Sequence, residues 1–138
     1  MTDDSDRSRG PASPFQFVAC PASVAAEATE RDLVVRIPFG ISRKHSLFRC
    51  FASALQFPGY FGGNWDAFRE CLLDLNWLDP PPSRIVVIHD DLPFVPGQKD
   101  LSIYLSLLSE CGSQSREPQF HVVFSERHAQ TIARQALC

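Results

Sequence analysis

Three stretches of the chain carry the dense β-branched and aliphatic pattern of buried strands. They are Asp32-Leu-Val-Val-Arg-Ile-Pro-Phe39, Arg84-Ile-Val-Val-Ile-His89 and Phe120-His-Val-Val-Phe124. The middle stretch is apolar at almost every position, which is typical of a parallel strand buried on both faces. A weaker alternation over residues 15–20 predicts one more short strand, which belongs to an N-terminal extension of this core.

Elsewhere the apolar positions recur every three or four residues, which predicts helices. Ser42 is expected to open the first long helix, whose apolar stripe is Leu47, Cys50, Phe51, Ala54 and Leu55. Asn64 is expected to cap the next one, whose apolar face is Trp65, Phe68, Cys71, Leu72 and Leu75. Further helices are predicted over residues 21–30, 100–111 and 127–137.

The order of strand, helices, strand, helix and strand predicts an α/β fold. We expect a small three-stranded parallel sheet with helices packed on it, together with N-terminal and C-terminal extensions. The length of 138 residues suits one domain, which we place at residues 15–138. The polar residues 1–14 are expected to form a disordered tail.

The composition excludes several classes of protein. No apolar run approaches the roughly 20 residues that span a bilayer, and the first residues lack the basic and apolar blocks of a secretory leader. The five cysteines are scattered and contain no Cys-x-x-Cys pair, which favours neither disulfides nor a zinc site. We therefore expect a cytoplasmic protein with no metal, no cofactor and no membrane partner.

The charge is unevenly distributed. The chain has a formal net charge of −3, yet residues 64–91 carry six acids and two bases, a balance of −4 that leaves +1 for the remainder. An acidic surface repels nucleic acid and attracts basic partners. Nucleic acid is therefore not an expected partner.

Much of this charge falls on the helix that Asn64 is expected to cap. Asp66, Glu70 and Asp74 stand at i, i+4 and i+8, so they line one exposed helix face. Arg69 lies beside them and is expected to relieve part of their mutual repulsion. Spacing of this kind is by itself more typical of an ordinary solvated surface than of a site.

The residues before this helix favour a binding site over an ordinary solvated surface. The stretch Phe57-Pro-Gly-Tyr-Phe-Gly-Gly-Asn-Trp-Asp-Ala-Phe-Arg-Glu-Cys-Leu72 resembles the signature of the barstar family of ribonuclease inhibitors. The shared pattern is Pro-x-Tyr-aromatic-Gly-x-Asn-x-Asp-Ala, two further residues, an acid and Cys-Leu. In element order the resemblance extends from about residue 32 to residue 124, and its specific part covers residues 57–77.

The resemblance implies a barstar-like inhibitor rather than an enzyme. Its partner would be a cognate nuclease toxin, a basic protein and most plausibly a ribonuclease, bound as a heterodimer by a chain that is a monomer when free. The expected partner-binding residues are Tyr60, Phe61, Gly62, Gly63, Asn64, Asp66, Arg69, Glu70, Leu73, Asp74 and Trp77. Glu70 falls where the family has its dominant acid.

Two points depart from the family pattern. Arg69 replaces an aromatic residue, which leaves open whether the partner is a ribonuclease or a different toxin met by the same fold. The resemblance also does not identify the acid that the family carries on its later helix. A third interpretation keeps the acidic face but assigns it to an adaptor that binds a basic host protein.

Enzyme interpretations are weaker. Two carboxylates four residues apart, such as Asp66 and Glu70, would lie on a convex helix rather than in a sugar cleft. Cys71 is expected to be buried on an apolar face, where thiols are usually inert. The four histidines are dispersed, and the sequence has no phosphate-binding or dinucleotide-binding glycine motif. We therefore expect no catalytic residue.

Overall fold

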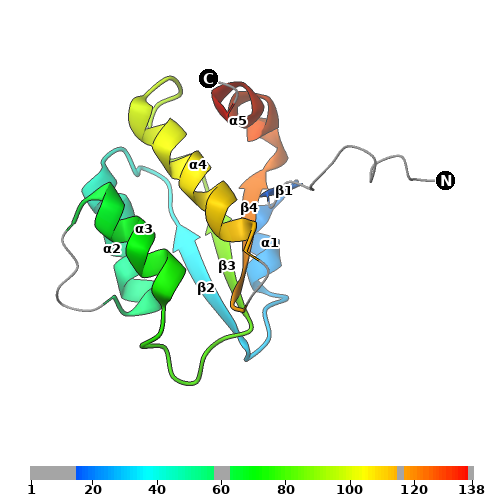
Figure 1. The fold of residues 1–138 in the computed structure, drawn as a ribbon. Helices are drawn as coiled ribbons and strands as arrows, with labels where there is room; N and C mark the ends of the chain where they lie inside the picture. Colours follow the sequence, from blue (N-terminus) through cyan, green and yellow to red (C-terminus); the bar gives the residue numbers. More distant parts are fainter. Residues whose placement is uncertain (1–14, 58–62, 115–116, 137–138) are drawn as a thin grey trace.

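The computed structural model describes residues 15–57, 63–114 and 117–136 of the chain (Figure 1). Its strands are β1 (Phe15–Val18), β2 (Asp32–Ile37), β3 (Arg84–His89) and β4 (Gln119–Ser125). Its helices are α1 (Pro21–Ala25), α2 (Lys44–Leu55), α3 (Trp65–Asp74), α4 (Lys99–Gly112) and α5 (Ala129–Ala136), and a 3₁₀ turn, η2 (Glu126–His128), precedes α5.

The four strands form one parallel sheet in the order β1-β4-β3-β2. The α/β class and the parallel sheet are confirmed, but the expected count of three strands was wrong. β1 joins the sheet because Phe15 and Phe17 both pack on Phe124 of β4, with ring centroids 5.4 and 6.0 Å away. The short strand expected over residues 15–20 is therefore present as β1, and the error was to leave it out of the sheet.

Two predicted helix boundaries also need correction. The helix expected over residues 21–30 spans only Pro21–Ala25. The helix that Ser42 was expected to open begins at Lys44, with Arg43 in the N-cap position and no side-chain cap. α2 therefore depends on the burial of Leu47, Phe48 and Phe51 rather than on its cap.

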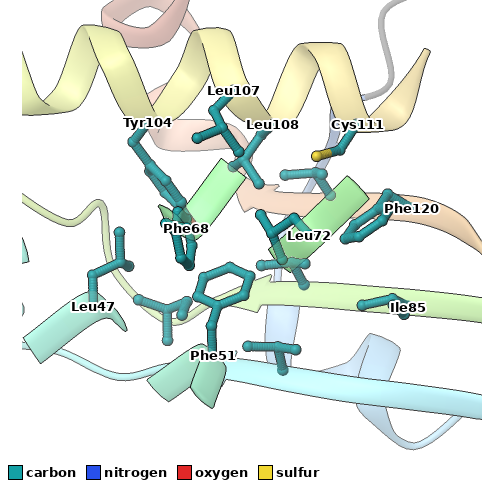
Figure 2. Packing of buried hydrophobic residues seen from close by; sticks show 14 of the residues in the cluster. Leu47, Phe51, Phe68, Leu72, Ile85, Tyr104, Leu107, Leu108, Cys111 and Phe120 are labelled. Atoms are coloured by element: carbon teal, nitrogen blue, oxygen red, sulfur yellow. The ribbon is translucent and has the colours of Figure 1, made fainter. Parts of the chain in front are cut away.

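The pleat of the sheet divides the core into two parts. On one face, Val86, Ile88 and Val123 form a small cluster with the residues of α1. The opposite face carries the main core, to which β2, β3 and β4 and helices α2, α3, α4 and α5 all contribute. Figure 2 shows part of this cluster, with labelled side chains from α2, α3, α4, β3 and β4 converging on one another.

Phe68 fixes α3 to this core. Its side chain is 0% exposed, and its ring lies 4.7 Å from that of Phe48 and 5.0 Å from that of Phe51. Aromatic pairs at such distances add to the free energy gained by burial. Phe68 therefore sets which side of α3 faces inward.

His89, at the end of β3, is a polar residue inside the core. Its Nδ1 lies 2.9 Å from the Val123 carbonyl oxygen and its Nε2 lies 2.7 Å from the Tyr104 hydroxyl. The ring is fully buried and stacks on Phe124. Burial lowers the pKa of His89 from 6.5 to about 4. The neutral ring satisfies both neighbours if Nδ1–H donates to the carbonyl and Nε2 accepts from the hydroxyl.

Among the residues that the structure describes, Cys20, Cys50, Cys71 and Cys111 are free thiols. The same residues contain no cluster of three or more His, Cys, Asp or Glu side chains arranged to hold a metal ion. They also contain no helix with the length and apolarity needed to cross a membrane.

An ion pair joins the first residues of β2 and β3. Arg84 donates two hydrogen bonds to the Asp32 carboxylate, and the two residues are paired in register. The guanidinium holds the pKa of Asp32 well below its usual range.

We expect Phe68→Ala to lower the free energy of unfolding by about 3–5 kcal/mol, because it removes a fully buried ring that α2 cannot replace. Denaturant unfolding measures the change. Asp74→Ala, on the exposed side of the same helix, is the matched control and should shift stability by no more than about 0.5 kcal/mol. Equal effects of the two substitutions would contradict the assigned orientation of α3.

Because the pKa of His89 is depressed in the folded protein, the unfolded chain binds the proton more tightly. The stabilisation is complete above pH 6.5 and is lost as the pH falls towards 4, by about 3 kcal/mol in all. Unfolding titrations across this interval should show the slope, and His89→Gln should flatten it. His121→Gln, at a half-buried histidine with a smaller depression, should retain most of it.

Candidate functional site

The approach to α3 is set by one glycine and one cap. Gly63 has a φ of +76°, in the left-handed region that favours glycine, while a Cβ at this position would meet no atom within 4 Å. Backbone conformation and not space therefore requires glycine here. The Asn64 side chain then accepts a hydrogen bond of 2.8 Å from the Ala67 N–H, which confirms the predicted N-cap. Tyr60, Phe61 and Gly62 lie outside the described residues.

Three carboxylates stand on the outer side of α3, and we call Asp66, Glu70 and Asp74 the acidic row. All three are exposed, as the helical spacing predicts. Among the residues that the structure describes, none of the three finds a partner for an ion pair or a side-chain hydrogen bond. Asp66 lies in the first turn of α3, where the helix dipole favours a negative charge.

The inner side of α3 begins with Trp65. Its indole N–H donates a hydrogen bond of 3.1 Å to the Asp100 carboxylate at the start of α4. Its ring packs on Phe48, Phe68 and Phe94. The N-terminal end of α3 is therefore tied to α4 by a polar contact as well as by apolar packing.

Arg69 makes the second connection between α3 and α4. Its Nε and one terminal nitrogen donate to the two carboxylate oxygens of Glu110, the first at 2.9 Å. The pair is half exposed, with side-chain accessibilities of 46% and 38%. The carboxylate raises the pKa of Arg69, and the guanidinium lowers that of Glu110. The hydrogen bonds of Arg69 thus go to the neighbouring helix, and within the acidic row Glu70 acts on it through charge alone. That Arg69 relieves part of the repulsion in the row stays a prediction.

A shallow pocket opens along the far end of α3. It is lined by Arg69, Glu70, Cys71, Leu73, Asp74 and Trp77, all but Cys71 among the expected partner-binding residues. The Trp77 indole N–H donates a hydrogen bond of 2.9 Å to the Leu55 carbonyl oxygen, and its ring lies edge-on to Phe57. Trp77 is thus a half-buried wall of this pocket and is fixed to the end of α2.

The fold also explains the acidic segment of residues 64–91. Asp90 pairs with Arg36 at 3.0 Å. Asp91 lies 3.6 Å from Arg127 and 3.2 Å from His128. These two acids follow the end of β3 and are opposed by bases from β2 and η2. The acidic row and the exposed Asp79 are therefore the acids of this segment that no described base pairs with.

The structure places all of the expected residues that it describes in one continuous region. Asn64, Asp66, Arg69, Glu70, Leu73, Asp74 and Trp77 lie along α3 and the turn after it, and Gly63 directly precedes them. Sequence reasoning did not pair Asp100 with Trp65 or Glu110 with Arg69, because the two partners lie 35 and 41 residues apart in the chain. Two signals pointed to a second acid opposite α3: the arginine in an aromatic position of the family motif, and the acid that the family carries on its later helix.

This face presents exposed carboxylates and a buried thiol. Cys71 is 6% exposed, and burial raises the pKa of its thiol, which disfavours the thiolate that a nucleophile needs. The carboxylates lie on a convex helix surface and point away from the core. Such groups are suited to accept charge-assisted hydrogen bonds from a cationic surface.

Comparison with protein families gives one match. The profile described as Barstar (barnase inhibitor) matches residues 33–125, which is well over half of the chain and includes the whole of α3. Comparisons with curated proteins and with solved structures find no match. The matched range begins in β2 and ends with β4, so β1, α1 and α5 lie outside it. The chain belongs to the barstar family, whose members are inhibitors of barnase-type ribonucleases.

Proposed function

We propose that this protein is a cytoplasmic immunity protein that binds a cognate ribonuclease toxin and blocks its active site with α3 and the segment before it. The observation that carries the proposal is the acidic row on a firmly held helix, which no other described residue pairs with, in a chain that belongs to the barstar (barnase inhibitor) family.

The chemistry of the target supports this role. A ribonuclease active site presents cationic side chains that stabilise charge on a phosphoryl group in transfer. Carboxylates spaced along a helix can occupy the positions of substrate phosphates and accept hydrogen bonds from arginine, often in pairs. Blocking the site requires no chemical step from the inhibitor. This agrees with a site made of exposed acids and a buried thiol.

Rigidity supports the same conclusion. α3 is held on its inner side by Phe68, at its start by Trp65 and at its middle by Arg69. A surface that is already ordered loses less conformational entropy on binding. Opposite charges on two proteins also accelerate their encounter, an effect for which this family's founding pair is itself a standard example.

A second candidate keeps the fold and changes the target to a toxin that does not cleave RNA. Arg69 favours this second candidate, because a guanidinium on the binding face would be repelled by a partner surface that is uniformly basic. An adaptor that binds a basic host protein through the same face is a third candidate. Its bound partner would remain active, whereas that of an inhibitor would not.

The direct test is to mix the purified protein with barnase, and with any small basic nuclease encoded next to its gene, and to measure RNA cleavage. The proposal expects a one-to-one complex and loss of cleavage. Inhibition of a neighbouring toxin with RNA left intact in unprotected cells would favour the second candidate. A complex with undiminished turnover would favour the adaptor, and no complex with any of these nucleases would contradict the proposed function.

We expect Glu70→Ala to weaken the complex by about 2–5 kcal/mol, as truncation of a buried charged anchor does. Calorimetric titration of each variant with the inhibited nuclease measures the loss. Glu27→Ala, at an exposed acid that follows α1, removes the same charge far from α3 and should leave the affinity within about threefold of wild type. Similar affinities for the two variants would contradict the role given to Glu70.

A further inference from the structure

Arg69 is a cation on the same helix as the three carboxylates of the acidic row. This guanidinium projects from the same helix as the acidic row, yet both of its hydrogen bonds go to Glu110 on α4. Glu110 is also the first cause of the raised pKa of Arg69, while Glu70 acts only through its charge and more weakly. The acidic row therefore shares its helix with a cation, Arg69, whose hydrogen bonds go to α4 instead of to the row.

Helical geometry supplies an alternative partner for this cation. Asp66 stands three residues before Arg69, and side chains at i and i+3 on a helix are neighbours. Without Glu110, Asp66 would be the acid at the spacing of a helical ion pair with Arg69, while the adjacent Glu70 already acts on Arg69 through its charge. Such a pair would neutralise the first member of the acidic row and place a long side chain across the face.

We propose that Glu110 is a positioning residue of the binding face, and that it keeps the acidic row open to a cationic partner by holding Arg69 against α4. This inference rests on the proposed function for its biological meaning, although the placement of Arg69 can be tested without any partner. It also assigns a reason for the arginine: the ion pair braces α3 on α4 at the place where the family pattern has an aromatic side chain.

The two-pronged geometry supports a holding role. Arginine and a carboxylate joined by two parallel hydrogen bonds are fixed in orientation as well as distance. Glu110 lies in the last turn of α4, a helix whose buried face includes Leu107, Leu108 and Cys111. The carboxylate is thus carried by an element anchored in the core, and the guanidinium it holds is correspondingly fixed.

The first experiment needs only this protein. In Glu110→Gln, NMR should show new contacts between the Arg69 Cδ protons and the Asp66 Cβ protons, and the Arg69 Nε–H should exchange with solvent faster than in the wild type. Thermal unfolding checks that the variant is folded. Retention of the wild-type Arg69 signals, or movement of the side chain without any approach to Asp66, would overturn the proposal.

The second experiment uses barnase as the probe in a double-mutant cycle, with Arg69→Met as the partner substitution. We expect Glu110→Gln to slow association at least about threefold more than Glu27→Gln, which removes an equal charge elsewhere. In the Arg69→Met background, Glu110→Gln should slow association no more than Glu27→Gln does, because no cation is left to release.

The outcomes separate the positioning role from other roles. An equal loss in both backgrounds would mean that Glu110 itself contacts the nuclease, and no loss in either would mean that Arg69 does not obstruct the row. Each result overturns the proposal. If the wild-type protein does not bind barnase, that result bears on the proposed function, and the NMR measurement decides the placement of Arg69 alone.

Discussion

The burial of the inner side of α3 is the interaction on which the rest of the structure depends. Phe68, Cys71 and Leu72 must enter the core that the sheet shares with α2 and α4. Since a helix turns once in 3.6 residues, burying these three side chains also fixes the direction of every other side chain on α3. Asp66, Glu70 and Asp74 are directed to solvent by the same apolar free energy that folds the protein. Stability and the proposed recognition therefore depend on opposite sides of the same helix.

Helix α4 contributes to that face without supplying its main charges. Asp100 holds Trp65 at one end of α3, and Glu110 holds Arg69 at its middle. Both acids are engaged with α3 and are not part of the acidic row. A half-exposed ion pair adds little to stability, so the value of the Arg69–Glu110 pair lies in the orientation of a side chain. An exposed pair of this kind would be overlooked if it were judged by energy alone.

Local patterns predicted what depends on neighbours in the chain. Asn64 as N-cap, the row at i, i+4 and i+8, and β3 as an inner strand all follow from spacing and residue type, and the structure confirms them. What failed depends on distant partners. β1 joins the sheet through Phe124, about a hundred residues later, and Asp90 is neutralised by Arg36, 54 residues earlier. Net charge per segment cannot anticipate such cancellation, and so the sequence overstated how much of residues 64–91 is acidic in space.

The hydrogen bond from Trp77 to the Leu55 carbonyl has a consequence for how such a protein changes over time. It joins the end of α2 to the turn after α3, so the segment from Gln56 to Asn76 begins and ends at the same hydrogen bond. Most of the expected contact residues belong to this segment, whereas none of the four strands does. Under the proposed function, lineages that meet an altered nuclease can therefore exchange surface positions within this one stretch, while the sheet that folds the domain stays unchanged.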